Sequence, residues 1–173
     1  MDEKAMVDLL RLYRHDLMND LQIVQGYASM GKIDRVQTKV TECMDRFHEE
    51  RKLMSLSAAK FALWLIQFNS IHANIRLSYY INVENKTLSG IDNTLLNQCQ
   101  LAIKSLEQLL DDEELYDGKM VLGHTSSAIE INLSLTGNFQ AQTILELNEK
   151  YMDKMNFCKA ENGVTCHVSI PFY

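Results

Sequence analysis

Proline and glycine, the two residues that most often interrupt helices, are scarce in this sequence. Proline occurs once in 173 residues, at Pro171, and glycine occurs seven times. This scarcity favours long helices. The hydrophobic share of 46% and the charged share of 23% are typical of a globular chain, and they argue against a disordered or fibrous protein.

A surplus of basic residues, a cysteine motif and an apolar leader are also missing. The net charge of −6 argues against nucleic-acid binding, which needs excess Lys and Arg to neutralise phosphates. The four cysteines form no Cys-x-x-Cys pair or zinc-type spacing, so we expect free thiols in a reducing compartment. The first ten residues contain no signal core, and the apolar stretch 61–75 is too short and too polar for a membrane span. We therefore expect a cytoplasmic protein without membrane contact.

Apolar residues recur every three or four positions through the first thirty residues, which predicts an amphipathic helix. Gly31 is expected to end this helix in a short turn, and a further apolar row predicts a second long helix. Because the link is tight, the two helices should be antiparallel neighbours. The first row consists of Met6, Leu10, Tyr13, Leu17, Leu21, Val24 and Ala28, and the second helix carries Ile33, Val36, Val40, Met44, Phe47 and Met54.

The first helix carries another apolar row beside the first, formed by Leu9, Leu12, Ile23 and Tyr27. Two helices cannot bury both rows on each other, and a hairpin alone encloses too little core to be stable. Two hairpins paired across a two-fold axis would form a four-helix bundle. The sequence thus predicts a homodimer, and the alternative is that the extra row packs against the rest of the same chain.

Beyond residue 56 the pattern changes to mixed helices and strands. The expected helices cover 58–73, 95–110 and 140–155, and Asp92 is predicted to cap the second of them. The expected strands cover 75–83, 120–122, 128–135 and 164–170. The predicted fold class is therefore α+β, with a helical hairpin over residues 1–56 and an α/β sandwich domain over residues 57–173.

His15 lies on the outer face of the first predicted helix. At about 100° per residue, it projects roughly 160° away from the centre of the first apolar row. Arg11 and Asn19 lie one turn to either side of it, and Asp8 and Gln22 extend the same polar row. An imidazole in this place is either a solvated surface side chain or a group that another protein can reach.

The residues around His15 resemble the phosphoacceptor helix of two-component signalling proteins. In that helix a histidine is followed by an acid and, four residues on, by Asn or Thr. Arg14-His15-Asp16 with Asn19, Leu21-Gln22, Gly26 and Gly31-Lys32 resembles more narrowly the sporulation initiation phosphotransferase B family of Bacillus-type spore formers. The ending, from Asn162 to Pro171, is similar to the last strand of a histidine-kinase ATPase domain, so the resemblance covers the whole chain.

This resemblance implies a histidine phosphotransferase of a phosphorelay in sporulation initiation. His15 would carry a phosphoryl group between the aspartates of two response regulators, since neutral imidazole offers an unprotonated ring nitrogen near pH 7. The donor would be a phosphorylated single-domain regulator, and the acceptor a regulator that controls transcription. The surface that docks both regulators would include Arg11, Leu12, Arg14, Asp16, Met18, Asn19 and Gln22.

The second domain departs from the ATPase pattern at both nucleotide motifs. Asn97 stands alone where an active kinase has an Asn-rich box, and Thr136-Gly137 stand where the Asp and first Gly of the adenine loop are expected. With seven glycines in the chain, no other phosphate-binding loop can be assembled. We therefore expect no nucleotide site and a degenerate ATPase-like domain. No metal site is expected either, because the Mg²⁺ needed for transfer would be held by the partner regulator.

Two other functions stay open at this point. The chain would be a sensor-type histidine kinase if it bound nucleotide through an atypical site, or a non-catalytic adaptor if it docked regulators without chemistry. The remaining histidines are predicted to be structural or solvated, because none has a second ligand at metal-binding spacing. They are His48, His72, His124 and His167.

Overall fold

The computed structural model describes residues 3–84, 86–111, 113–151 and 154–172. It divides into two compact units, Met1–Arg51 and Lys52–Tyr173. The predicted domain boundary after residue 56 stays a prediction. The boundary between the two compact units lies five residues earlier, after Arg51.

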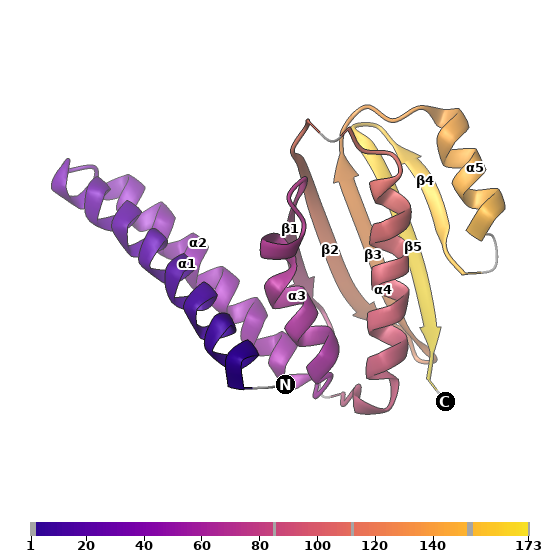
Figure 1. The fold of residues 1–173 in the computed structure, drawn as a ribbon, viewed down its shortest axis with the longest axis horizontal. Coiled ribbons are helices and arrows are strands. Elements are labelled where there is room, and N and C mark those ends of the chain that lie inside the picture. The colour runs from indigo at the N-terminus through magenta and orange to yellow at the C-terminus, as the bar shows by residue number, and fades with distance from the viewer. Residues whose placement is uncertain (1–2, 85, 112, 152–153, 173) are drawn as a thin grey trace. The chain divides into compact units, whose positions relative to one another are not determined.

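The first unit is an antiparallel helical hairpin (Figure 1). Its helices are α1 (Glu3–Ser29) and α2 (Ile33–Ser55). Gly31 has φ +67°, a left-handed conformation that glycine adopts without steric cost, and Lys32 N donates to the Tyr27 carbonyl at 3.0 Å. The predicted end of the first helix at Gly31 is therefore confirmed.

The second unit has a five-stranded sheet in the order β1-β2-β3-β5-β4. β1 is parallel to β2, and the other neighbouring strands are antiparallel. Its elements are α3 (Ala59–Ile71), β1 (Ile75–Ile81), η1 (Ser89–Ile91), α4 (Asp92–Glu107), β2 (Tyr116–His124), β3 (Ala128–Thr136), α5 (Ala141–Tyr151), β4 (Asn156–Ala160) and β5 (Gly163–Pro171). The predicted α+β class is confirmed.

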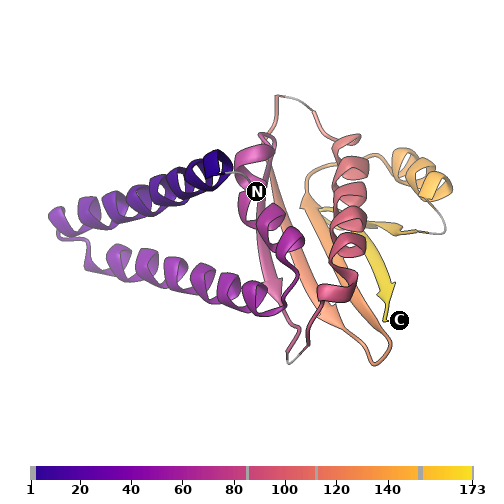
Figure 2. The same cartoon turned by 60° about the horizontal axis from the view of Figure 1, so that its bottom comes forward.

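Helices α3 and α4 lie on one face of this sheet in both views (Figures 1 and 2). Alternate residues of the strands are buried beneath them, as in β5, where Val164, Cys166, Val168 and Ile170 point into the core. Trp64 belongs to the same core. Among the described residues, no helix is both long and apolar enough to span a membrane.

Strand β4 is not foreseen by the sequence pattern. Only Phe157 of its five residues is buried, so it shows no alternation of apolar side chains. The side chain of Asn148 in α5 instead bonds both the amide (2.7 Å) and the carbonyl (2.6 Å) of Phe157. This contact satisfies backbone groups of β4, which is the outer strand of the sheet formed by the described residues.

Asp92 caps a different helix from the one predicted. It is the first residue of α4 rather than the residue before it, and its carboxylate accepts hydrogen bonds from the amides of Lys60 (3.0 Å) and Phe61 (2.9 Å). These amides lie in the first turn of α3, whose own N-cap residue, Ala58, makes no side-chain bond. Because α3 lacks a local acceptor, the acid of a distant segment satisfies its orphan donors.

We expect Asp92→Ala to lower the free energy of unfolding by about 1–2 kcal/mol, the usual cost of removing a helix cap. Urea titration followed by circular dichroism measures the difference. Glu161→Ala, which removes an exposed carboxylate from the β4–β5 turn, is the control and should change stability by less than about 0.5 kcal/mol. Equal midpoints for the two variants would contradict the capping role.

Candidate functional site

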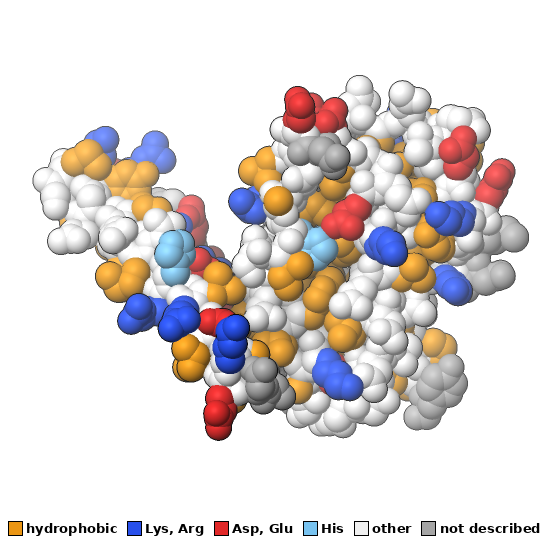
Figure 3. Space-filling view, viewed as in Figure 1, with side chains coloured by type: hydrophobic (Ala, Val, Ile, Leu, Met, Phe, Trp, Pro, Cys, Tyr) orange, Lys and Arg blue, Asp and Glu red, His pale blue; other side chains and the backbone are white. Residues whose placement is uncertain are grey.

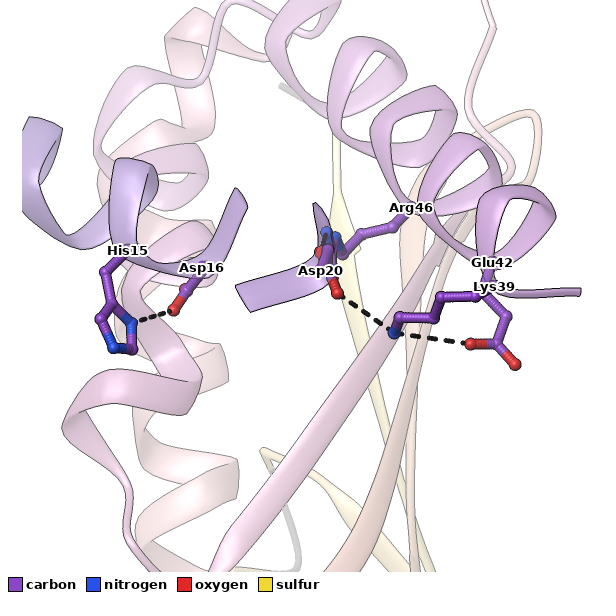
Figure 4. A network of polar contacts seen from close by, with 6 residues as sticks. All are labelled: His15, Asp16, Asp20, Lys39, Glu42 and Arg46. Carbon is purple, nitrogen blue, oxygen red and sulfur yellow. Dashed lines mark hydrogen bonds and ion pairs between the residues drawn. The ribbon is translucent and has the colours of Figure 1, made fainter. Parts of the chain in front are cut away.

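His15 lies at the surface of α1 and contacts its neighbour Asp16. Its side chain is 78% exposed, and Nδ1 lies 3.1 Å from Asp16 Oδ1 (Figure 4). An ionised carboxylate only accepts hydrogen bonds, so this contact places the proton of a neutral ring on Nδ1. Nε2 is then the nitrogen whose lone pair remains for reaction.

The other predicted site residues lie around His15 on the same helix. Arg11 is paired with Asp8 at 3.1 Å between Nη1 and Oδ1. Leu12 is the one that is partly buried, so it offers less contact surface than predicted. The exposed members of the set are Arg11, Arg14, Asp16, Met18, Asn19 and Gln22. The structure thus places basic, polar and apolar side chains within reach of one approaching partner.

An apolar row of α1 is exposed in the single chain. Leu10 is 67% exposed and Met6 53%, and hydrophobic side chains stand at the surface of the hairpin beside Lys and Arg (Figure 3). The exposed members of the predicted first row are Met6, Leu10, Tyr13, Leu17, Leu21 and Ala28, and those of the predicted row on α2 are Ile33, Val40, Met44 and Met54. A surface of this kind is unfavourable in water, and the predicted homodimer would cover it. The homodimer itself stays a prediction.

Between the two helices lies an ion network that the sequence pattern does not predict. Asp20 is buried, with 6% of its surface exposed, and Lys39 Nζ lies 3.1 Å from its Oδ1. Arg46 pairs with Oδ2 of the same carboxylate, and Lys39 also lies 3.6 Å from Glu42 (Figure 4). One buried acid is therefore shared by two cations of α2.

The network alters the acidity of its members. Burial alone would raise the pKa of Asp20, but hydrogen bonds from Arg46 and Lys39 outweigh it and lower that pKa. For Arg46, burial opposes the charged form, yet Asp20 above all, and Asp16 more weakly, raise its pKa. Asp16, the partner of His15, is thus within the electric field of the network.

A polar pair of different character lies further along the hairpin. Burial raises the pKa of Glu50, against the hydrogen bond from Tyr13 and the charge of Arg46, which lower it. Tyr13 also packs beside Phe47, with ring centroids 6.4 Å apart. The interior of the hairpin is therefore partly polar, in contrast to the continuous apolar seam that the sequence suggests.

The positions related to nucleotide binding in the resembled kinases lie in the second unit. Asn97 is exposed on α4. Thr136, at the end of β3, donates its hydroxyl to the carbonyl of Asp117 at 2.8 Å, and Gly137 N donates to Asn162 at 3.1 Å. Within the described ranges, no group of three or more His, Cys, Asp or Glu side chains is placed to hold a metal ion. The expectation that the chain takes no nucleotide stays a prediction.

Comparison with known proteins identifies the hairpin. A family described as the SpoOB-type sensor kinase, alpha-helical domain, matches residues 1–56. Sporulation initiation phosphotransferase B of Bacillus subtilis (strain 168) is 31% identical over 108 residues, which are 62% of this chain and 56% of the relative. The chain thus matches little more than half the length of this relative, and the predicted resemblance to the sporulation initiation phosphotransferase B family is confirmed.

Solved structures similar to the chain are histidine kinases. The blue-light activated histidine kinase of Erythrobacter litoralis EL346 has a TM-score of 0.46 at 11% identity, covering 91% of this chain and 59% of that one. Histidine kinase AdeS of Acinetobacter baumannii has a TM-score of 0.39 at 11% identity, covering 91% and 97%. Histidine kinase ThkA, solved in complex with response regulator protein TrrA, has a TM-score of 0.42 at 15% identity, covering 95% and 61%. All three similarities are distant.

Proposed function

We propose that this protein is a phosphorelay histidine phosphotransferase, in which His15 receives a phosphoryl group from one response regulator and passes it to another. The observation that carries the proposal is the exposed imidazole of His15, bonded through Nδ1 to Asp16. Its place in a SpoOB-type helical domain supports the same chemistry. The process that the relay would serve is the initiation of sporulation.

The proposed step is an in-line displacement at phosphorus. The Nε2 lone pair attacks the phosphorus of a regulator's aspartyl phosphate, so that an N–P bond forms while the bond from phosphorus to the aspartate oxygen breaks. The aspartate leaves with the electron pair as a carboxylate. The ring becomes positively charged, and Asp16 stabilises this charge through the proton on Nδ1. Transfer to the second regulator is the same step in reverse on a different carboxylate.

We expect both this protein and the regulator bound to it to neutralise the charge of the phosphoryl group during this step. Arg11 and Arg14 lie one turn before and one residue before His15, and both are exposed. Their positive charge suits the acidic pocket of a regulator and the phosphate it carries. The Mg²⁺ that phosphoryl transfer needs would be held in that acidic pocket. Met18, whose flexible side chain is 48% exposed, suits a surface that must accept two partners in turn.

The proposal includes a homodimer. Pairing through the exposed row of α1 would enclose Leu10 and Leu21 in a four-helix bundle and leave His15 on the outside, because the row and the histidine lie about 160° apart on the helix. Each bundle would then present two phosphoacceptor histidines to solvent.

The proposal is tested by mixing the protein with response regulator domains of a spore-forming bacterium that carry labelled aspartyl phosphate. We expect label to appear on the protein within minutes as an acid-labile, base-stable phosphoramidate. Incubation with labelled ATP and Mg²⁺ is the parallel arm, and it should leave the protein unlabelled. Labelling by ATP alone would instead identify a sensor-type kinase, and binding of regulators without any labelling would identify an adaptor.

A further inference from the structure

The two apolar rows of α1 leave its rotation about its own axis poorly defined by hydrophobic contacts alone. At about 100° per residue, the two rows are centred roughly 105° apart around the helix. Each of the two rows on α1 could by itself form an apolar seam with α2. Starting from an orientation midway between the rows, a turn of about 50° would bring one row or the other, depending on its direction, to face α2 at little cost in buried apolar surface.

Asp20 lies within about 10° of the line midway between these two rows. Its carboxylate is buried and meets Lys39 at 3.1 Å and also Arg46, two cations spaced one heptad apart on α2. Turning α1 either way would carry Asp20 out of reach of these partners and leave a buried acid unpaired, which is strongly unfavourable. The flanking residues agree with this orientation, because Leu9 and Val24, one from each row, are both partly buried.

His15 lies about 140° around the helix from Asp20. While Asp20 faces α2, His15 projects away from it, which accounts for its 78% exposed side chain. A turn of about 50° in one direction would bring the imidazole to the flank of the hairpin, beside α2. The same turn would move Leu10 and Leu21 away from the surface where a second hairpin would meet them.

We propose that Asp20, held by Arg46 and Lys39, is a positioning residue that sets the rotation of α1 and so keeps His15 directed outward. This inference rests on the proposed function of His15. The network acts on specificity of structure rather than on stability, because a buried ion pair is commonly replaced by apolar side chains without loss of stability. The side chains of Lys39 and Arg46 are 22% and 46% exposed, so water can solvate both charges when Asp20 is removed.

The decisive variant is Asp20→Leu in the full-length protein. We expect its melting temperature to equal or exceed that of the wild type, because leucine joins the two apolar rows into one wide surface. We expect the imidazole of His15 to give two sets of NMR signals, or signals broadened by exchange, where the wild type gives one set. Uptake of phosphoryl groups from a labelled regulator should fall about tenfold. Asp45→Leu, which replaces an exposed acid of α2, is the matched control and should leave all three measurements unchanged.

A charge exchange completes the test. The double variant Asp20→Arg with Arg46→Asp restores an ion pair between the helices, and Lys39 keeps Glu42 as its partner. We expect it to recover a single set of His15 signals and the wild-type rate. The proposal is overturned if Asp20→Leu keeps one set of signals and full uptake, if it melts well below the wild type, or if the exchange restores nothing. The NMR measurement needs no regulator, so it tests the role of Asp20 independently of phosphoryl transfer. If the wild-type protein takes up no phosphoryl group, that result contradicts only the proposed function of His15.

Discussion

Replacing His15 with glutamine is expected to abolish the acid-labile phosphate on this protein and to stop transfer between regulators. Glutamine matches the size and polarity of histidine but offers no nucleophilic ring nitrogen. Loss of a catalytic nucleophile costs up to about 10⁶-fold in rate, so we expect a fall of at least about 10³-fold. The measurement is the amount of label that passes from a phosphorylated donor regulator to the acceptor in the presence of each protein.

The fold should survive this change. The side chain of His15 is mostly exposed and its bond to Asp16 is a surface contact, so the free energy of unfolding should change by less than about 0.5 kcal/mol. His48→Gln is the control, because His48 is an exposed histidine of α2 that contacts Arg51 at 3.2 Å. Full relay activity in the His15 variant, or equal losses in both variants, would show that another group carries the phosphate.

The largest effect on stability is expected from Gly163→Ala at the start of β5. Gly163 pairs with Thr136 across the β3–β5 ladder. A methyl group at Gly163 would lie 1.9 Å from the carbonyl oxygen of Leu135, and neither backbone can retreat without breaking the ladder. Overpacking of this severity lowers the free energy of unfolding by about 3 kcal/mol or more.

Thermal unfolding provides the measurement, and the melting temperature should fall by about 6–12 °C for a chain of this size. Gly123→Ala is the matched control, because Gly123 also lies within a strand, β2, and an added methyl group there meets no atom within 4 Å. Its melting temperature should stay within about 2 °C of the wild type. Similar melting temperatures for both variants would mean that the ladder yields at Gly163.

Much of the hairpin follows from the sequence alone. The apolar spacing of the first thirty residues and the position of Gly31 predict α1 and its end, since both signals are local to the helix. The outward direction of His15 follows from the same angular reasoning. The sequence predicts only that Asp16 belongs to the docking surface around His15, and the structure adds its contact with Nδ1 at 3.1 Å. That contact depends on side-chain rotamers, which no sequence spacing determines.

The second unit shows where local patterns lose their value. Its long strands alternate between buried and exposed residues, so β3 and β5 are recognisable. Strand β4 buries only Phe157 and is ordered by Asn148 of α5, a contact without a sequence signature. The acid at position 92 is recognisable as a capping residue, but the helix it caps is not.

By itself the sequence determines the helical hairpin, the α+β character of the second unit and the outward face that carries His15, because periodicity depends only on neighbours along the chain. Tertiary structure alone decides which distant groups meet. Asp92 reaches the amide of Lys60, 32 positions away, and Asp20 reaches Arg46, 26 positions away. The sequence shows which polar side chains need a hydrogen-bonding or charged partner, but the rotation and packing of the helices determine which partner each one contacts.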